Sequence, residues 1–175
     1  MPPLPELHIR ALDENDLAAY KALRDHALAH DDEAFTSDAA AESARTAQSY
    51  RSRLGCDDSG GGSFTLGAWR GGVLVGALSC ERDGRAKVRH VGHLVGMMVR
   101  PEMRGGGIGR ALLETCLAEV RRAEGLELLT LSVTAGNVPA ERLYETAGFV
   151  RYGLLKNAIK LDGRYHDKQL MALTL

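Results

Sequence analysis

The sequence predicts a single-domain α/β fold with a mixed, mostly antiparallel sheet of about seven strands and about four helices. A chain of 175 residues suits one domain with a sizeable core. Short apolar segments separated by turn residues are typical of strands, and other segments carry apolar residues at helical spacing. In order, the pattern reads β-α-α-β-β-β-α-β-α-β-β, which places helices on both faces of one sheet.

The first third of the chain predicts one strand and two helices. Residues 7–12 alternate between apolar and polar side chains and indicate the first strand. Asp13–Asp16 offers capping residues for a helix whose apolar residues recur at helical spacing up to Leu28. A second, Ala-rich helix is expected from about Ala39 to about Leu54, and residues 55–62 then predict a flexible loop.

The rest of the chain contains further segments with the apolar pattern of strands. They are residues 64–69, 73–80, 91–99, 126–133, 149–160 and 165–173. Gly71-Gly72 and Asp162-Gly163 each lie between two of these segments and are typical of hairpin turns. We therefore expect two hairpins, a charged turn at residues 82–89, and a helix after each of the strands at residues 91–99 and 126–133.

The most informative stretch follows the strand predicted at residues 91–99. Pro101 ends that strand, because proline has no N–H for the ladder. Residues 105–109 then include four glycines, and a helical pattern runs from about Ala111 to about Glu124. A glycine loop at a helix N-terminus exposes backbone N–H groups where the helix dipole also favours anions. Arg104 and Arg110 flank the loop with positive charge, so the stretch predicts a phosphate site.

Two familiar phosphate-binding loops do not fit this stretch. A Walker loop needs a Lys directly after its last glycine, and none stands there. A dinucleotide fingerprint needs a third glycine where this chain has Leu112. A third pattern, Arg-x-x-Gly-x-Gly after Val-x-Pro, is filled by Arg104, Gly107 and Gly109. The alternative is a surface turn without a ligand, which the combination of strand, proline, basic flanks and helix disfavours.

A second motif lies on a short predicted helix. Residues 137–149 read Asn-x-x-Ala-x-x-Leu-Tyr-x-x-x-Gly-Phe, where Pro139 fits the first turn of the helix and Gly148 its C-terminal cap. Together, the two motifs and the strand order resemble the GCN5-related N-acetyltransferase (GNAT) family from about residue 64 onward. The segment 160–171 also resembles bacterial small-molecule and uncharacterised members. The resemblance implies one GNAT domain over residues 1–175, with acetyl-CoA as co-substrate.

The resemblance also implies which residues bind the cofactor. They are Met97, Met98, Val99, Arg104, Gly105, Gly106, Gly107, Ile108, Gly109, Arg110, Asn137 and Tyr144. The backbone of residues 97–99 would pair with the pantetheine arm, and the N–H groups of residues 105–110 would hold the pyrophosphate. Asn137 would contact the cofactor near its pantetheine, and Tyr144 would donate a proton to the departing thiolate as the general acid. The alternatives are that Tyr144 only packs its helix against the sheet and that Asn137 is a helix N-cap, which is compatible with cofactor contact.

The residue that accepts a proton from the amine is left open. Some GNAT members carry a Glu five residues before the Asn, and that position is Ser132 here. Histone-type members carry a Glu at the position of His93, and a neutral histidine could act as a base at pH 7. Glu81, His90 and a chain of water molecules are further alternatives.

Composition bounds the partners and the compartment. A net charge of −1 shows no basic field for nucleic acid, and no apolar run approaches the length that spans a membrane. The N-terminal residues lack the basic and apolar regions of a signal peptide. The three cysteines stand in no metal-ligand spacing. We therefore expect a cytoplasmic protein without a metal site and without nucleic-acid or membrane partners.

The predicted function is acetyl-CoA-dependent N-acetylation of a primary amine, on a small molecule or a peptide, by direct transfer in a ternary complex. The acidic segment Asp31–Glu33 could form part of the acceptor wall and attract a cationic amine. A non-catalytic acyl-CoA-binding regulatory module and a transferase for another acyl group are the alternatives. A homodimer is also possible, because exposed edge strands invite pairing.

Overall fold

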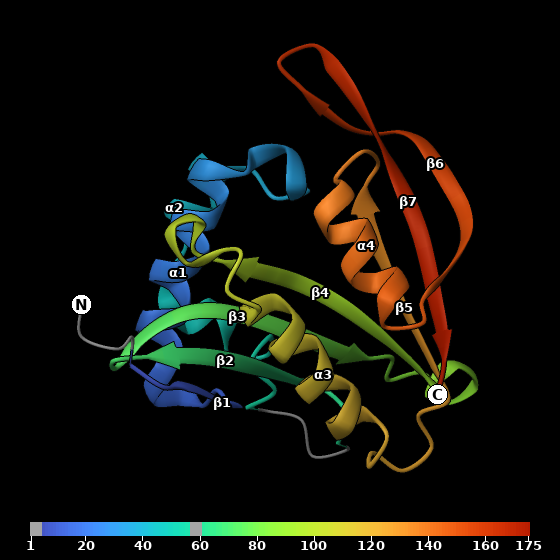
Figure 1. Cartoon of the computed structure of the whole chain (residues 1–175), viewed down its shortest axis with the longest axis horizontal. Helices are drawn as coiled ribbons and strands as arrows, with labels where there is room; N and C mark the ends of the chain where they lie inside the picture. Colours follow the sequence, from blue (N-terminus) through green and yellow to red (C-terminus); the bar gives the residue numbers. More distant parts are fainter. Residues whose placement is uncertain (1–4, 57–60) are drawn as a thin grey trace.

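The computed structural model describes residues 5–56 and 61–175, and its strands form one seven-stranded sheet in the order β1-β2-β3-β4-β5-β7-β6 (Figure 1). The strands are β1 Leu7–Ala11, β2 Phe64–Arg70, β3 Val73–Arg82, β4 Val91–Val99, β5 Leu128–Thr134, β6 Val150–Leu161 and β7 Arg164–Thr174. Neighbouring strands run antiparallel except β4 and β5, which are parallel. The predicted mixed, mostly antiparallel sheet is confirmed.

Helices cover both faces of this sheet. They are α1 Leu17–His30, α2 Ala39–Ser43, α3 Ile108–Val120 and α4 Val138–Thr146. Because successive side chains of a strand point to opposite faces, Leu74 and Val75 of β3 belong to two different hydrophobic clusters. Leu74 packs with Tyr20 and Leu23 of α1, whereas Val75 packs with Leu112 of α3. The two clusters hold the helices on opposite sides.

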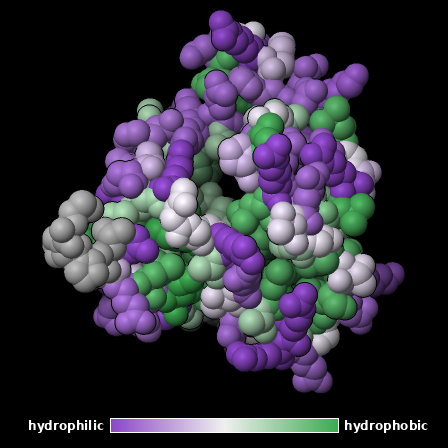
Figure 2. Space-filling model, in the orientation of Figure 1, coloured by the Kyte–Doolittle hydropathy of each residue, from purple (hydrophilic) through white to green (hydrophobic). Residues whose placement is uncertain are grey.

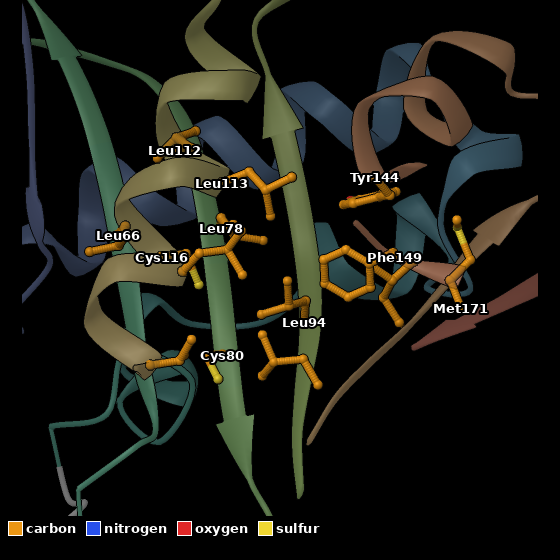
Figure 3. Close-up of a cluster of buried hydrophobic side chains, with 14 of the residues drawn as sticks. Leu66, Leu78, Cys80, Leu94, Leu112, Leu113, Cys116, Tyr144, Phe149 and Met171 are labelled. Carbon is orange, nitrogen blue, oxygen red and sulfur yellow. The ribbon is translucent and has the colours of Figure 1, made fainter. Parts of the chain in front are cut away.

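The cluster under α3 continues to α4 and the last strands. Figure 3 shows Leu113 and Cys116 of α3 on one side of β4 and Tyr144, Phe149 and Met171 on the other. The rings of Tyr144 and Phe149 meet edge to face, with centroids 5.8 Å apart. This shared core fixes α3 and α4 relative to β4, which becomes important for the site between them.

The predicted helix from Ala39 to Leu54 is wrong in its extent. α2 ends at Ser43, and a separate 3₁₀ turn, Ala47–Tyr50, follows. The side chain of Ser43 competes for a backbone group at this point, because its Oγ donates to the carbonyl of Ala40 at 2.8 Å. Part of the predicted flexible loop, residues 57–60, and the N-terminal residues 1–4 lie outside the described residues.

The sheet opens between β4 and β5. The two strands pair only from Val91 to His93 on β4, and beyond that point they diverge (Figure 1). On its other edge, β4 carries one extra residue relative to β3, since the register shifts between Ala77 and Ser79. Gly96 lies in this bulge with φ +63°, a conformation that a side chain would disfavour. Within the described residues, this divergence leaves the second half of β4 without a strand partner on the β5 side.

Strand β6 is one edge of the sheet and carries exposed apolar side chains, including Val150, Tyr152 and Leu155. The homodimer considered from the sequence stays a prediction, and β6 is the edge at which we expect it. Leu155→Lys places a charge on this edge and is therefore expected to shift a dimer to monomers. Sedimentation velocity of both proteins checks this, and identical monomeric profiles would contradict it.

Candidate active site

The glycine loop presents unpaired backbone donors at the start of α3. A 3₁₀ turn, Pro101–Met103, follows β4, and α3 begins after Gly107, which has φ +79°. The first backbone bond of the helix runs from the N–H of Ala111 to the carbonyl of Gly107 at 2.9 Å. Within the described chain, no backbone carbonyl accepts from the N–H groups of residues 105–110. These donors lie at a helix N-terminus, which is a ready anion site.

A cavity of about 500 Å³ lies against this loop. It is lined by the β4 edge, the glycine loop, α4 and the segment after α1: Asp31, Ala34, Phe35, Met97, Met98, Val99, Met103, Arg104, Gly105, Gly107, Ile108, Gly109, Arg110, Asn137, Pro139, Ala140 and Leu143. We call it the loop cavity. A Cβ placed on Gly105 or Gly107 would meet no atom within 4 Å, so both glycines border open space. Figure 2 shows the surface hollowed between β4 and α4. The loop cavity therefore has room for a phosphate close to the backbone.

The arginines that flank the loop differ in their partners. Arg104 pairs with Asp31 at the end of α1, and its Nε also donates to the carbonyl of Val99 at 3.1 Å. Arg110 is exposed and pairs with Glu114 one helical turn later at 2.7 Å. The Arg104–Asp31 pair thus joins the glycine loop to α1 across the loop cavity, and it neutralises part of the charge expected there.

Two predicted cofactor contacts lie on the opposite wall of the loop cavity. Met97, Met98 and Val99 occupy the part of β4 that has diverged from β5, so their backbone groups on that side face the loop cavity rather than a strand. Asn137 caps α4, because its Oδ1 accepts from the N–H of Ala140 at 3.3 Å, and it also lines the loop cavity. Capping and cofactor contact are compatible for this residue.

A second cavity, of about 270 Å³, meets the first. We call it the tyrosine cavity, because Tyr144 lines it. Met97, Asn137 and Ala140 line both cavities, so a molecule in one can reach a molecule in the other at the open edge of β4. The arrangement suits two substrates that react at Met97.

Tyr144 is buried, with 6% of its surface exposed. Burial raises the pKa of its phenol to about 12, because the charged form loses its solvation. The phenol therefore keeps its proton at neutral pH. Tyr144 also packs on Phe149, so both the packing role and the chemical role considered from the sequence fit its position.

His93 contacts β5 and lies outside the two cavities. Its Nδ1 is 2.6 Å from Oγ1 of Thr130 on β5, and it lines neither the loop cavity nor the tyrosine cavity. Ser132 does line the tyrosine cavity, whereas Glu81 is paired with Arg53 at 2.7 Å. The assignment of His93 as the base stays a prediction that the geometry does not favour.

The acidic segment, Asp31–Glu33, lies outside the tyrosine cavity, and its role in an acceptor wall stays a prediction. Asp31, Asp32 and Glu33 line a third cavity, of about 610 Å³, which His166 and Asn137 also line. None of the three lines the tyrosine cavity. The charge of residues 31–33 does not by itself predict this placement, because Asp31 forms an ion pair with Arg104, which is distant in the sequence.

Three charged residues of the tyrosine cavity were not predicted from the sequence, namely Arg24, Arg53 and Lys168. One signal was available for Arg24: it stands in the buried stripe of α1 beside Leu23, where a charged residue needs a partner or a function. Lys168 lies opposite Thr134 in the β5–β7 ladder, a position that only the strand register reveals.

Comparison with known proteins identifies the family. The profile of the Acetyltransferase (GNAT) family matches residues 17–149. The chain belongs to this family. A GNAT-family acetyltransferase from Streptococcus pneumoniae has the same fold, with a TM-score of 0.90, 26% identity, and coverage of 97% of this chain and 100% of that one. The yncA putative acetyltransferase from Salmonella typhimurium, solved with acetyl-CoA, has a TM-score of 0.79 and 25% identity, over 97% of this chain and 94% of that one.

Curated relatives match shorter stretches. A mycothiol acetyltransferase of Thermobispora bispora is 39% identical over 49% of this GNAT chain and 29% of its own length. The N-alpha-acetyltransferase RimI of Mycobacterium tuberculosis is 35% identical over 56% of this chain and 59% of its own length. The chain therefore spans less than two thirds of these relatives.

Within residues 5–56 and 61–175, no helix combines the length and apolarity needed to cross a bilayer. The same residues contain no group of three or more His, Cys, Asp or Glu side chains placed to hold a metal ion. Cys80 and Cys116 are buried and form no disulfide within the described residues.

Proposed function

We propose that this GNAT chain transfers an acetyl group from acetyl-CoA directly to a primary amine of a small molecule or peptide, in a ternary complex in the cytoplasm. The observation that supports this best is the junction of the two cavities. The loop cavity ends at unpaired amides, the tyrosine cavity ends at a protonated phenol, and both open onto Met97. Holding both substrates at one junction replaces a bimolecular encounter with an intramolecular one.

The cofactor half of the proposal rests on backbone groups. The N–H groups of residues 105–110 would donate to the pyrophosphate, and the free edge of β4 at residues 97–99 would pair with the pantetheine arm as an added strand would. A thioester at the end of that arm would then lie near Met97 and Asn137, where the two cavities meet.

The chemical half needs an oxyanion donor and an acid. The candidate donor to the developing oxyanion is a backbone N–H on the open side of β4, where one donor is typically worth about 3 kcal/mol. Because the N–H of Arg100 donates to Val75 of β3, strand alternation turns the N–H of Met98 toward β3 and that of Val99 toward the open side. Tyr144 keeps its proton and would give it to the departing thiolate. The amine must lose a proton on binding, and the described residues of the tyrosine cavity include no carboxylate or histidine that could take it.

An acceptor screen with acetyl-CoA tests this proposal. We expect coenzyme A release with at least one class of amine, measured as free thiol. Tight binding of acetyl-CoA without turnover of any amine would instead favour the non-catalytic acyl-CoA-binding module. Competition among acetyl-, propionyl- and succinyl-CoA decides whether another acyl group is preferred.

Gly107→Ala is expected to weaken acetyl-CoA binding. Its Cβ would project into the open space beside the unpaired amides, where the diphosphate would lie. Loss of one or two charge-assisted hydrogen bonds corresponds to roughly a 10- to 100-fold rise in Kd. Because Gly107 has φ +79°, the variant is also expected to lose about 1–2 kcal/mol of stability. Titration calorimetry and thermal unfolding measure the two effects.

Gly163→Ala is the matched control for this variant. Gly163 has φ +77° in the turn between β6 and β7, and a Cβ there would likewise meet no atom within 4 Å. It does not line the loop cavity, so the same backbone strain should leave the affinity for acetyl-CoA unchanged. Equal affinities of the two variants for acetyl-CoA would mean that the glycine loop does not bind the cofactor.

A further inference from the structure

The tyrosine cavity is surrounded by positive charge. Three cationic side chains line it, namely Arg24 from α1, Arg53 from the segment before β2 and Lys168 from β7. Among the described residues, no Asp or Glu lines this cavity. An acceptor that enters it therefore meets a cationic wall, the opposite of the acidic wall expected from residues 31–33.

Each of the two arginines is held by a glutamate that does not line the tyrosine cavity. Arg24 donates from Nε to Glu42 at 2.7 Å and from a terminal nitrogen to Ser37 at 2.9 Å. Arg53 pairs with Glu81 through Nε at 2.7 Å. Glu42 and Glu81 line a different cavity, so both carboxylates stand behind their arginines as seen from the tyrosine cavity. In the described chain, the second terminal nitrogen of Arg24 has no protein acceptor, which leaves its donors for a ligand.

Lys168 differs from the arginines, because it lacks a counter-charge. Its Nζ donates to Oγ of Ser132 at 3.3 Å, and no carboxylate of the described residues lies within 4.0 Å of it. Burial lowers the pKa of Lys168. A half-buried ammonium without a counter-charge is costly, and an anionic ligand would reduce that cost.

We propose that the acceptor is a small primary amine that also carries a carboxylate, and that Lys168, assisted by Arg24 and Arg53, binds this carboxylate in the tyrosine cavity. This inference rests on the proposed acetyl transfer and names its substrate class. Amine and anion must fit a cavity of about 270 Å³, below the range of pockets for drug-sized ligands. Free amino acids meet both conditions, whereas polyamines and aminoglycoside-like polycations would be repelled.

The same charges give the amine a reason to lose its proton. Positive charges near an ammonium disfavour its charged form and lower its pKa, so the acceptor would bind more readily as the free nucleophile. The carboxylate offsets the cationic wall, while the nitrogen sits at the junction near Met97 as a neutral amine. This explains how the reaction could proceed although neither His93 nor a carboxylate lines the tyrosine cavity.

The experiment compares acceptors that differ only in charge. Each of the standard amino acids is paired with its own amide, in which an uncharged carboxamide replaces the carboxylate, and a simple diamine represents polycations. For every accepted side chain, wild type is expected to prefer the acid over the amide by about 10- to 100-fold in kcat/KM. Coenzyme A release with acetyl-CoA is the readout.

Substitutions of Lys168 test whether this residue causes the preference for the acid over the amide. Lys168→Met should raise the KM of the acid about tenfold or more with a smaller change in kcat, and bring the acid-to-amide ratio close to one. Lys168→Arg should keep most of the preference. Lys87→Met is the control, because Lys87 is exposed, lies far along the chain between β3 and β4, and lines neither cavity. Lys87→Met removes the same charge and should leave KM, kcat and the acid-to-amide ratio unchanged.

Each outcome decides the proposal. Faster turnover of amides or of the diamine by wild type would overturn it while leaving acetyl transfer established. If acetyl-CoA binds but no amine reacts, the transferase proposal fails, and calorimetry with N-acetyl amino acids and their amides then tests the carboxylate site by itself. A preference for the N-acetyl acid that Lys168→Met abolishes supports the site. Equal binding of acid and amide, or no binding, overturns it.

Discussion

Tyr144→Phe is expected to lower kcat by about 100- to 10,000-fold, the range typical of a lost general acid. The substitution removes only the hydroxyl, and the ring can keep its edge-to-face contact with Phe149. Because Tyr144 lines the tyrosine cavity and not the loop cavity, the affinity for acetyl-CoA should hardly change. A large fall in kcat with an unchanged Kd would separate the acid from a merely structural tyrosine.

The measurement uses the best amine from the acceptor screen and steady-state coenzyme A release. Tyr152→Phe is the control, since Tyr152 is 61% exposed on β6 and the same hydroxyl is lost there without consequence. Wild type and Tyr144→Phe should unfold at similar temperatures. A variant that matches wild-type kcat on a good substrate would refute the role of Tyr144.

The pH profile gives a second check on Tyr144. Since burial raises its pKa to about 12, the phenol stays protonated as pH rises through the usual assay range. Below about pH 11, the activity of wild type should therefore show no alkaline loss that depends on the hydroxyl of Tyr144. A basic limb near pH 10 that vanishes in the variant would mean that the phenol titrates like an exposed tyrosine.

Much of the fold and the cofactor side could be predicted because the signals are local. Pro101 and the glycines of residues 105–109 mark the end of a strand and the start of a helix within one short stretch. Turn dipeptides such as Asp162-Gly163 fix a hairpin in the same way. Each of these depends on backbone conformations that few residue types allow.

The acceptor side could not be predicted, because it depends on contacts between distant residues. Arg24 meets Glu42 through α1 and α2, and Lys168 reaches the tyrosine cavity only through the register of β7 with β5. The opening itself depends on an extra residue at Gly96, which shifts the β3–β4 register and has no signature in the alternation of residues 91–99. Tertiary pairing decided these features and overrode local charge and periodicity.

Glu42→Ala is expected to destabilise the protein by about 3–5 kcal/mol, the usual cost of leaving one member of a buried ion pair uncompensated. Glu42 is only 7% exposed and accepts hydrogen bonds from Arg24, Tyr50 and Arg45 at 2.7, 2.8 and 2.9 Å. Without it, the buried guanidinium of Arg24 has no counter-charge. Urea unfolding measures the loss of unfolding free energy. The midpoint temperature of thermal unfolding should fall by about 2–4 °C for each kcal/mol lost.

Two further variants tell an ion-pair effect from a cavity effect. Glu42→Gln keeps the size of the side chain and should still cost most of this stability, because the charge on Arg24 stays uncompensated. The double variant Arg24→Met with Glu42→Leu removes both charges and should recover much of the loss, since apolar replacements of buried pairs are often neutral. Equal instability of the double and single variants would mean that packing, not charge, explains the effect.

Lowering the pH should protonate Glu42 and remove its contribution to stability. Burial opposes the charged form of Glu42, but the hydrogen bonds from Arg24, Tyr50 and Arg45 outweigh it and lower its pKa to about 2. An unfolded Glu titrates near ~4.3. Its contribution is therefore fully present above about pH 4.3 and is lost as pH falls toward 2. Unfolding free energy should fall less steeply over that window in Glu42→Gln than in wild type. Since Arg24 also lines the tyrosine cavity, the acid-sensitive pair that stabilises α1 and α2 would hold part of the acceptor wall in place.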